Sequence, residues 1–376
     1  MSDNQNALRG DGKLSVLFVE QPTLGHAIRD AVIKVYQQGN RVETPKHQKD
    51  GTLGYDADVL VKVNNPTEAP QIYSPTMWDG PETLMQYILE VTHGIHDHWL
   101  KSPEHPERWG YTYHERFVDQ LPFVFQRIKH DWQKNGRITG RDYQFTTWRA
   151  GEDIVLDQPD PPCLQIGHLR FLQNSEGGWV LNYCSDWRSR CEFKAWNSNN
   201  VAQVELMKLM GMKVSDMLGI PVELGVYSDR SRSLHLYGMY FDKENIRPTI
   251  ENTIIPNKNP ERNFRDLDDY LYNRDYLKRF VAAQTDASDK GLGTQLQEDG
   301  LKKLGYDVKT FPYPTEWDSW PKSWDAAPDA SKLARVYSNE DILREAGTLV
   351  GKSYEEMRQM FLCRPDKDTR AHIMRE

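Results

Sequence analysis

The pattern of apolar and polar positions divides the first two thirds of the chain into helical and extended stretches. Residues 15–36 are predicted to be a short apolar run followed by a helix. Apolar positions at helical spacing predict further helices at residues 81–91, 116–136 and 200–218. Alternating or β-branched runs predict strands at residues 58–64, 143–149, 165–173, 178–185, 222–227 and 233–241. The polar, Gly-containing stretch at 38–57 is expected to be a loop, of the kind that can close on a ligand.

The strongest helical pattern lies between Asn200 and Leu218, and it ends at Gly219 and Pro221. Its apolar residues recur every three or four positions: Val201, Val204, Met207, Met210, Val214 and Met217. A stripe of this kind is typical of a helix packed in a core rather than of a cofactor site.

Beyond Asp242 the chain changes character and becomes charged, with several prolines. We therefore expect a main domain at residues 1–250 and a helical C-terminal extension, residues 251–376, packed on it. Trp317, Trp320 and Trp324 recur at helical spacing in this extension. They are predicted to form its packing face or part of an oligomer contact.

Composition and charge limit the possible functions. Of the 376 residues, 38% are hydrophobic and 11% aromatic, which is ample for a core. A net charge of −8 disfavours duplex nucleic acid as a partner, whereas a small anionic substrate needs only a few local arginines. No run approaches 18 apolar residues and no signal segment is evident, so we expect no membrane association and a cytoplasmic location. The four cysteines show no CxxC spacing, which fits a reduced setting.

Cys163 is the residue with the clearest chemical potential. Pro161 and Pro162 hold the preceding backbone extended, which fixes where the thiol emerges. A thiolate is nucleophilic only where cations or dipoles lower its pKa, and arginines lie on both sides in the sequence, at 137, 141, 149, 188 and 190. Spacing alone does not bring them to the thiol, and most lone cysteines are buried and inert.

Several short motifs occur in an order that resembles the thymidylate synthase family over roughly residues 80–242. These are Pro161-Pro162-Cys163, then Arg188-Ser189, then a helix preceded by Asn199, then His235-Leu236-Tyr237. The variants Cys163-Leu164-Gln165, Tyr111-Thr112-Tyr113-His114-Glu115-Arg116 and Ser233-Leu234-His235 are similar to those of pyrimidine-nucleotide hydroxymethylases from phage and antibiotic pathways.

The resemblance implies a fold and a partner. The fold is of the α/β (α+β) class, a three-layer arrangement around a mixed, mostly antiparallel sheet, with residues 1–250 as the catalytic domain. The resemblance further implies a homodimer in the cytoplasm, which is the host cytoplasm if the protein is phage-encoded.

The resemblance also implies a reaction on a nucleoside monophosphate. Cys163 adds to C6 of the pyrimidine, which makes C5 a nucleophile for the one-carbon unit of 5,10-methylenetetrahydrofolate. Addition of water then gives a 5-hydroxymethyl product, whereas a thymidylate synthase uses hydride and gives dTMP. A non-catalytic nucleotide-binding homologue is the alternative outside the enzyme class.

The resemblance assigns the substrate contacts as follows. Arg188 and Ser189 bind the phosphate, and Arg141 is donated across the dimer interface. Asn199 reads the base edge, and its carboxamide favours uracil over cytosine, with Asn197 and Asn200 as alternative registers. His235 and Tyr237, on one face of a strand, contact the sugar.

Three further roles are implied with less agreement between the motifs. Tyr111 is the proton-transfer tyrosine, with Tyr113 as the alternative, and Glu90 and Glu82 are the candidates for the general base. Cys191 stands where the family has an aspartate that contacts folate, so either Glu192 beside it is the substitute cofactor contact, or folate is held differently, or the one-carbon donor is not the standard one. The histidines between positions 93 and 114 are too loosely spaced for a ligand set, and no metal is expected.

Overall fold

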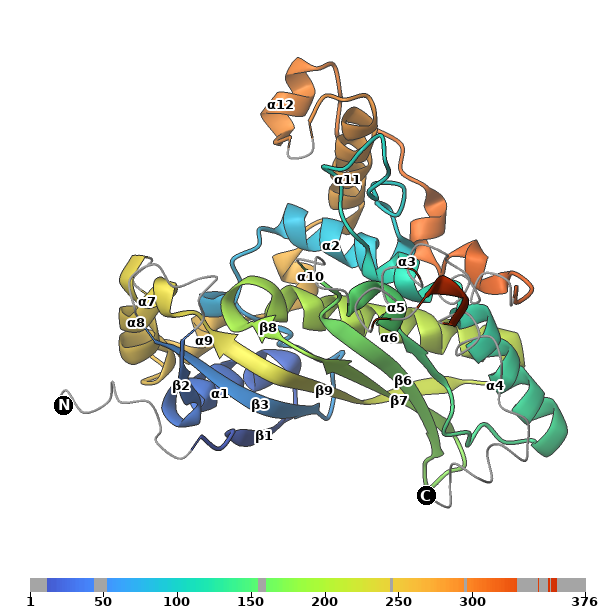
Figure 1. The fold of residues 1–376 in the computed structure, drawn as a ribbon, viewed down its shortest axis with the longest axis horizontal. Coiled ribbons are helices and arrows are strands. Elements are labelled where there is room, and N and C mark those ends of the chain that lie inside the picture. Colours follow the sequence, from blue (N-terminus) through green and yellow to red (C-terminus); the bar gives the residue numbers. More distant parts are fainter. Residues whose placement is uncertain are drawn as a thin grey trace.

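The computed structural model describes residues 12–43, 53–154, 160–243, 246–293, 296–329, 344, 351 and 353–356. Figure 1 shows a broad sheet at one side of the molecule and helices stacked above it. The predicted α/β fold with a mixed, mostly antiparallel sheet is confirmed, because four of the seven strand pairings in the main sheet are antiparallel.

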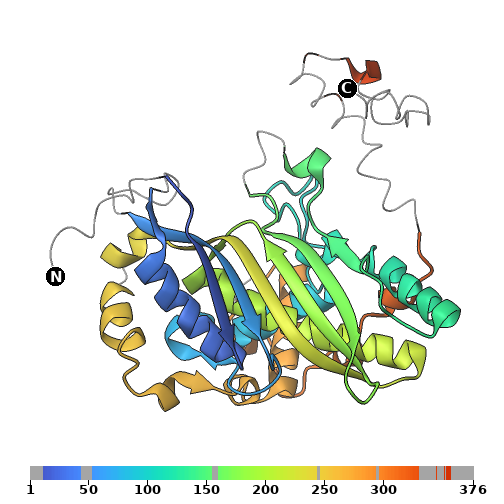
Figure 2. The same cartoon turned by 90° about the horizontal axis from the view of Figure 1, so that it is seen from below.

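The main sheet has eight strands and runs in the order β1-β3-β9-β7-β6-β5, with β2 paired to β3 and β8 paired to β9. Its strands are β1 (Val16–Gln21), β2 (Asn40–Val42), β3 (Gly54–Val63), β5 (Gln144–Thr146), β6 (Leu164–Gln173), β7 (Trp179–Trp187), β8 (Arg190–Cys191) and β9 (Val222–Leu236). A separate pair joins β4 (Ile72–Tyr73) to β10 (Phe264–Arg265). Figure 2 shows the main strands side by side, from blue β1 and β3 through yellow β9 to the green strands.

The helices lie between and after these strands. They are α1 (Leu24–Gln38), α2 (Pro81–His93), α3 (Tyr113–Phe117), α4 (Leu121–Asn135), α5 (Ala150–Asp153), α6 (Asn197–Leu218), α7 (Gly238–Lys243), α8 (Ile246–Thr249), α9 (Pro260–Asn263), α10 (Leu267–Tyr270), α11 (Arg274–Asp289) and α12 (Glu298–Lys303). Two π-helical turns, Glu192–Trp196 and Ile250–Ile254, and three 3₁₀ turns, Ser74–Thr76, Thr315–Asp318 and Lys322–Asp325, complete the described elements.

The elements form three layers in the order sheet, α6 with α1, and α2 with α11 above α6 (Figure 1). One face of the sheet is buried under the helices, as the alternation in β3 shows: Val59, Val61 and Val63 are buried, whereas Leu60 between them is exposed. The face that contains Leu60 is not covered by any described helix. We call it the open face.

The predicted core helix is confirmed and begins three residues earlier than expected, at Asn197. Met207, Met210 and Val214 are buried within the layers. Gly211 lets α6 approach the sheet closely, because a Cβ at this position would lie 2.8 Å from Cδ2 of Leu224 in β9.

Two predictions differ from the structure, the first of them because of a proline. The helix predicted at 116–136 is two helices, α3 and α4, and α4 begins where Pro122 occupies its first turn. Its predicted end is confirmed, since Gly136 closes α4 with a left-handed φ of 61°. The stretch 38–57, predicted as a loop, contains β2 and the start of β3, while residues 44–52 lie outside the described residues.

The two strands predicted at 222–227 and 233–241 are one long strand, β9, and residues from Gly238 onward are helical. The polar stretch between them misled the prediction. Asp229 and Ser231 face the buried side and bond to Arg190, while Arg230 pairs with Asp58 on the open face. Polar side chains with partners inside the protein therefore continue the strand.

The part after residue 250 packs against the main sheet and its helices. Helix α11 lies along α2, and Trp324 is buried against Phe125 of α4 with ring centres 5.6 Å apart. Trp317 and Trp320 are partly buried against the core. The three tryptophans lie in or beside two 3₁₀ turns rather than in one helix. Among the described helices, none is long and apolar enough to cross a membrane.

Candidate active site

Cys163 lies directly before β6, and Arg188 lies directly after the neighbouring strand β7. Backbone N–H of Arg188 donates to the carbonyl of Cys163 at 2.8 Å. The Arg188 guanidinium donates from Nε to the carbonyl of Pro162 at 3.0 Å and from Nη2 to that of Pro161 at 2.6 Å. The two prolines and Arg188 therefore hold the cysteine loop, and the predicted proximity of Cys163 and Arg188 is observed.

The pKa of the Cys163 thiol reflects opposing effects. Burial raises it above its ordinary value, and Asp160 raises it further, whereas Arg188 and Arg190 lower it. A hydrogen bond from Tyr113 also lowers it, because it stabilises the thiolate. The net effect is a pKa above the ordinary value, so the half-buried thiol is mainly protonated near neutral pH, beside two cations and a hydroxyl donor that stabilise its thiolate.

Two tyrosines, Tyr111 before α3 and Tyr113 at its first position, connect the thiol to a cavity. The rings of Tyr111 and Tyr113 are 5.6 Å apart, and Tyr113 packs edge-on against Trp187 at 5.5 Å. Burial raises the pKa of Tyr111 to about 12 and that of Tyr113 well above its ordinary value. Both phenols therefore remain protonated near neutral pH and act as hydrogen-bond donors.

The cavity beside these tyrosines has a volume of about 210 Å³. Its lining comes from α2, from the segment before α3 and from the first residue of α3, and includes Tyr87, Glu90, Trp109, Tyr111 and Tyr113. Glu90 accepts hydrogen bonds from Gln86 at 2.8 Å and pairs with Nδ1 of His96 at 2.7 Å. Of the two glutamates predicted as general base, Glu90 is the one that the structure places beside Tyr111.

Asn199 is buried in the first turn of α6 and donates to the hydroxyl of Tyr87 at 2.5 Å. Tyr87 lines the 210 Å³ cavity, so Asn199 is one side chain away from it. Asn197 bonds instead to Thr76, and Asn200 accepts from Tyr227 at 3.0 Å. Of the three asparagines, Asn199 is therefore the one whose carboxamide bonds to a residue of this cavity.

His235 and Tyr237 lie at the end of β9, with ring centres 4.5 Å apart. His235 pairs in register with Cys191 of β8. Burial raises the pKa of Tyr237 to about 12, and the nearby Cys191 and Cys163 raise it further while Arg188 lowers it. Tyr237 is therefore close enough to Cys163 and Arg188 for their charges to shift its pKa.

A network of buried polar side chains around Arg190 adjoins the site. Arg190 donates through Nε to Ser231 at 3.0 Å, forms an ion pair with Asp229, and lies over the ring of Trp187 at 4.2 Å. Asp229 also accepts from the indole of Trp196 at 3.1 Å. Because its partners are buried with it, the charge of Arg190 is fixed in place under Cys163 and Tyr87, whose pKa values it lowers.

Cys191 and Glu192, the predicted cofactor contacts, are buried behind this network. The Cys191 thiol contacts the Tyr240 hydroxyl at 3.6 Å. Glu192 is 0% exposed, and neither of its carboxyl oxygens has a hydrogen-bond partner among the described residues. Burial and the nearby Asp56 raise the pKa of Glu192 well above its ordinary value. Neither residue lines a described cavity, and their contact with a cofactor stays a prediction.

Three other predicted residues lie away from Cys163 or make no described contact with it. Glu82 lines a second, larger cavity and accepts from the Tyr272 hydroxyl at 3.2 Å. Arg141 is exposed, and its carbonyl lies 3.2 Å from Nε2 of His168 on the open face. Ser189 is partly exposed between β7 and β8.

Two histidines of the segment between α2 and α3, and one in α3, each have a different carboxylate partner. Nδ1 of His96 lies 2.7 Å from Glu90, Nε2 of His98 lies 2.7 Å from Asp289, and Nδ1 of His114 lies 2.6 Å from Asp97. Among the described residues, no group of three or more His, Cys, Asp or Glu side chains is arranged to hold a metal ion.

Sequence reasoning missed Tyr87, Trp109 and the Arg190–Asp229 pair. Tyr87 precedes Glu90 by three residues on the same predicted helix, so a helical-face argument from Glu90 would have found it. Arg190 and Asp229 are 39 residues apart, on strands that the alternation pattern does not pair. No local signal in the sequence identifies that contact.

The chain was compared with protein-family models, curated proteins and solved structures. No protein-family model matches the sequence, and no curated protein matches it. Among solved structures, the chain is similar to the thermostable thymidylate synthase A from Bacillus subtilis, with 15% sequence identity and a TM-score of 0.42. The similarity covers 60% of this chain and 83% of that chain. At this score it carries no argument about activity, which rests here on the site.

Proposed function

We propose that the chain is a folate-dependent one-carbon transferase of the thymidylate synthase type, and specifically a pyrimidine-nucleotide 5-hydroxymethylase that converts dUMP to 5-hydroxymethyl-dUMP. The observation that carries the proposal is the environment of Cys163. Its thiol lies beside Arg188, receives a hydrogen bond from Tyr113 and adjoins the 210 Å³ cavity that contains Glu90 and Tyr111.

The chemistry begins with the thiolate of Cys163. Its sulfur forms a bond to C6 of the pyrimidine, and the electron pair of the C5–C6 double bond moves to C5, which becomes nucleophilic. The carbon unit that C5 acquires comes from 5,10-methylenetetrahydrofolate, which supplies it in this chemistry. A base would then remove the proton from C5 as the carbon–nitrogen bond to the donor breaks and tetrahydrofolate leaves with that electron pair. Water would add to the resulting exocyclic methylene as the sulfur leaves C6.

Each residue of the site has a role that its contacts support. Arg188 and Arg190 favour the thiolate, and protonated Tyr111 and Tyr113 supply donors to the ring oxygens. Glu90 is the proposed base for the C5 proton, because it lines the same cavity as Tyr111. The thiolate is the deprotonated form of Cys163, so the rate should rise as pH increases towards the pKa of that thiol.

The remaining substrate contacts follow from the resemblance. Asn199 would read O4 and N3–H of uracil, either directly or through Tyr87, to which it is bonded. His235 and Tyr237 would contact the sugar. Arg188 and Ser189 would bind the phosphate, using the part of the guanidinium that is not bonded to Pro161 and Pro162.

The described residues fit one half of the cofactor. The reduced pterin ring is flat and carries an amino group and an N–H, which suit Trp109, Tyr111 and the carboxylate of Glu90. The other half ends in a glutamate with two carboxylates, and the adjoining larger cavity has no Lys or Arg among its lining residues. The contacts proposed for Trp109, Tyr111 and Glu90 therefore involve only the pterin ring of the cofactor.

A mechanism-based inhibitor tests the nucleophile. A 5-fluoropyrimidine nucleotide has no proton that can leave C5, so it stops the reaction at the covalent adduct. We expect intact-protein mass spectrometry to show one adduct on Cys163, and none with Cys163→Ser. If the wild-type protein binds the nucleotide without forming an adduct, a non-catalytic nucleotide-binding protein is the better description.

Product analysis separates the two enzyme reactions. The protein is mixed with methylenetetrahydrofolate and, in turn, dUMP, dCMP and CMP. Hydroxymethylation adds CH₂O to the nucleotide mass and leaves the folate as tetrahydrofolate. Formation of dTMP together with dihydrofolate absorbance would identify a thymidylate synthase instead.

We further propose that two copies of the chain pair through the open face of the sheet. Phe18 of β1, Leu60 of β3 and Ile166 of β6 are exposed on this face, which leaves apolar area that no described helix covers. Arg141 lies exposed at the same face, so a second copy would receive it as the resemblance implies. A cytoplasmic location, in the host if the protein is phage-encoded, belongs to the same proposal.

A further inference from the structure

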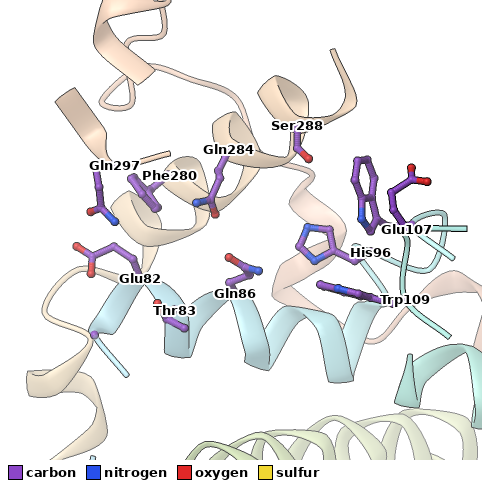
Figure 3. Close-up of a pocket in the computed structure, with 12 residues that line it drawn as sticks. Glu82, Thr83, Gln86, His96, Glu107, Trp109, Phe280, Gln284, Ser288 and Gln297 are labelled. Atoms are coloured by element: carbon purple, nitrogen blue, oxygen red, sulfur yellow. The ribbon is translucent and has the colours of Figure 1, made fainter. Parts of the chain in front are cut away.

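Residues 94–112 join α2 to α3 and form one side of the candidate active site. Trp109, Tyr111 and Thr112 of this segment line the 210 Å³ cavity. His96 and Trp109 also close one end of the larger cavity, which has a volume of about 670 Å³ and lies between α2 and α11 (Figure 3). The conformation of the segment therefore determines the shape of both cavities.

Asp97, near the start of the segment, bonds to both residues that flank Tyr113. Its Oδ1 accepts a hydrogen bond from the hydroxyl of Thr112, and its Oδ2 lies 2.6 Å from Nδ1 of His114. A carboxylate has no hydrogen to donate, so Nδ1 is the nitrogen of His114 that donates here. Thr112 and His114 lie 15 and 17 residues further along the chain. One carboxylate therefore closes the segment on both sides of Tyr113.

The bond to Thr112 also orients the start of α3. Thr112 is the N-cap of this helix, and its Oγ1 accepts from the backbone N–H of Glu115 at 3.0 Å. The hydroxyl hydrogen goes to Asp97, so the Thr112 side chain has an orientation that satisfies both partners. Helix α3 has five residues, and a helix this short is not stable by itself. Its position therefore depends on such bonds to the rest of the chain.

The end of α2 packs directly against the Asp97–His114 pair. Gly94 ends α2 with a left-handed φ of 63°, and a Cβ at this position would overlap with Nδ1 of His114 and Oδ2 of Asp97. His114 is buried, and its ring centre lies 5.6 Å from that of Phe117. The pair therefore lies between the end of α2 and the start of α3. Its histidine is shielded from water, which strengthens the hydrogen bond.

Tyr113, between the two residues that Asp97 binds, is the residue that contacts the nucleophile. Its hydrogen bond to Cys163 stabilises the thiolate, and its ring packs edge-on against Trp187 at 5.5 Å. The hydroxyl is at the far end of the side chain, so a small rotation of the Tyr113 backbone moves it by a larger distance. Because a hydrogen bond is directional, the bond to the thiolate depends on how firmly this backbone is held.

We infer that Asp97 is a positioning residue, which holds the Tyr113 hydroxyl at the Cys163 thiol through its bonds to Thr112 and His114. Asp97 is not among the residues that line the 210 Å³ cavity, so it acts through Tyr113. Its part in one-carbon transfer rests on the proposed function. Its effect on the thiol is a property of the protein without substrate.

Alkylation of Cys163 by iodoacetamide tests this role in the full chain, with peptide mass spectrometry to separate Cys163 from the other cysteines. In Asp97→Ala, Tyr113 is no longer held, so the pH at half-maximal alkylation should rise and the rate at pH 8 should fall by about fivefold. Asp97→Asn keeps an oxygen that accepts from Thr112, so its rate should fall less than that of Asp97→Ala.

A double variant distinguishes positioning from a general loss of packing. Tyr113→Phe removes the hydroxyl and should lower the alkylation rate by a similar amount. Asp97→Ala added to Tyr113→Phe should then cause no further fall, because the route from Asp97 to the thiol is already lost. An equal fall in both backgrounds would show that Asp97 affects the thiol in another way, and the positioning role would be overturned.

Asp289→Ala is the matched control, because Asp289 is the carboxylate partner of His98 in the same segment, at 2.7 Å. In this variant, Cys163 should be alkylated at the wild-type rate. If Asp97→Ala and Asp289→Ala are both alkylated at that rate, Asp97 has no positioning role.

A second pair of variants applies if circular dichroism shows that Asp97→Ala does not fold. Thr112→Val keeps nearly the volume of threonine without its hydroxyl, and Thr112→Ser keeps the hydroxyl. Alkylation should slow in Thr112→Val and stay near the wild-type rate in Thr112→Ser, and equal rates in the two would overturn the role of Asp97. Adduct formation with a 5-fluoropyrimidine nucleotide is measured separately, so its failure would overturn the proposed reaction and leave the alkylation result standing.

Discussion

At the scale of single residues, the reactivity of Cys163 depends on a balance between burial and nearby cations. Burial raises the thiol pKa, and Arg188 is the largest influence that lowers it. Arg188 also holds the carbonyls of Pro161 and Pro162, so it sets both the charge and the shape of the loop. A substitution at Arg188 must therefore be compared with one that keeps the charge.

The first prediction concerns the rate at which Cys163 is alkylated. In Arg188→Ala, the thiolate loses its main cation, so the pH at half-maximal alkylation rises and the rate at pH 8 falls by roughly tenfold. Arg188→Lys keeps a positive charge, so its alkylation rate should fall less. The measurement is iodoacetamide labelling with peptide mass spectrometry, which separates Cys163 from the other cysteines.

Arg232→Ala is the control for this experiment, because Arg232 pairs with Asp186 on the open face, away from the thiol. Cys163 in this control variant should be alkylated at the wild-type rate. An unchanged pH profile in Arg188→Ala would show that Arg188 does not govern the thiolate.

The second prediction concerns the buried carboxyl group of Glu192. Burial and Asp56 raise its pKa well above the ordinary value of 4.5, so the folded protein keeps a proton that the unfolded chain releases. The free energy of unfolding therefore falls as pH rises above 4.5 towards the raised pKa. Glu192→Gln removes this titration. We expect it to match wild type near pH 5 and to exceed it by a few degrees in Tm at pH 8.

Thermal unfolding between pH 5 and pH 8 measures this difference, with Glu176→Gln as the control for an exposed glutamate. A Tm difference that stays constant across this range would mean that Glu192 titrates as an ordinary carboxyl. The test does not depend on ligand or activity.

The residues of the site show what a motif order can and cannot predict. The placement of Cys163 beside Arg188, and of Asn199 near Tyr111, follows from motifs that are short but occur in sequence. The Arg190–Asp229 pair could not be predicted, because it depends on the register of β8 against β9. Register is set by the whole sheet rather than by the residues that meet.

At the scale of elements, strands and helices with apolar periodicity were predicted well. Strands β6 and β7 lie where the pattern indicates, because buried side chains alternate along each, and helix α6 lies where its apolar stripe indicates, buried between the sheet and α2. The long strand β9 was divided in error, since its central polar residues are satisfied by Arg190 and Asp58. Apolar periodicity therefore fails to predict a strand where polar side chains form hydrogen bonds or ion pairs inside the sheet.

The third prediction tests the packing of two elements through their glycines. Gly167 of β6 lies under Phe145 of β5, and a Cβ there would lie 2.1 Å from the ring. Gly167→Ala should therefore displace Phe145 and reduce the free energy of unfolding by about 2 kcal/mol. Gly211→Ala is the matched control, because the Cβ meets only a flexible methyl of Leu224 at 2.8 Å.

For Gly211→Ala, the helix propensity gained by α6, up to about 1 kcal/mol, offsets the small adjustment of Leu224. Thermal or urea unfolding of both variants measures the difference. Equal stability of the two variants would mean that β5 yields to the new methyl group, and that the contact between Gly167 and Phe145 is not tight.

At the scale of the whole molecule, the described helices cover one side of the sheet and leave the other side open. Val16, Phe18, Leu60, Ile166 and Leu172 are exposed on the other side, and Leu172 is 51% exposed. Ion pairs such as Arg230–Asp58 and Arg232–Asp186 lie among them. A surface of mixed polarity with an apolar component is typical of a contact between protein chains. The same face carries Arg141, which has no described role within its own chain.

The fourth prediction follows from that arrangement. If two copies pair through the open face, Leu60→Asp combined with Ile166→Asp places four carboxylates in the contact and converts the dimer to a monomer. Light scattering coupled to size-exclusion chromatography measures the mass, and circular dichroism checks that the fold is kept. Met212→Asp is the control, because Met212 is 47% exposed on α6, away from this face.

The dimer prediction also has a functional consequence that separates it from simple association. If Arg141 completes the phosphate site of the partner, Arg141→Ala should weaken binding of dUMP by roughly tenfold while the protein remains a dimer. Mixing Arg141→Ala with Cys163→Ser should then restore activity, because a heterodimer contains one site with both an intact thiol and an arginine from the other chain. A wild-type protein that is monomeric, or mixed variants that stay inactive, would place the second phosphate contact within a single chain.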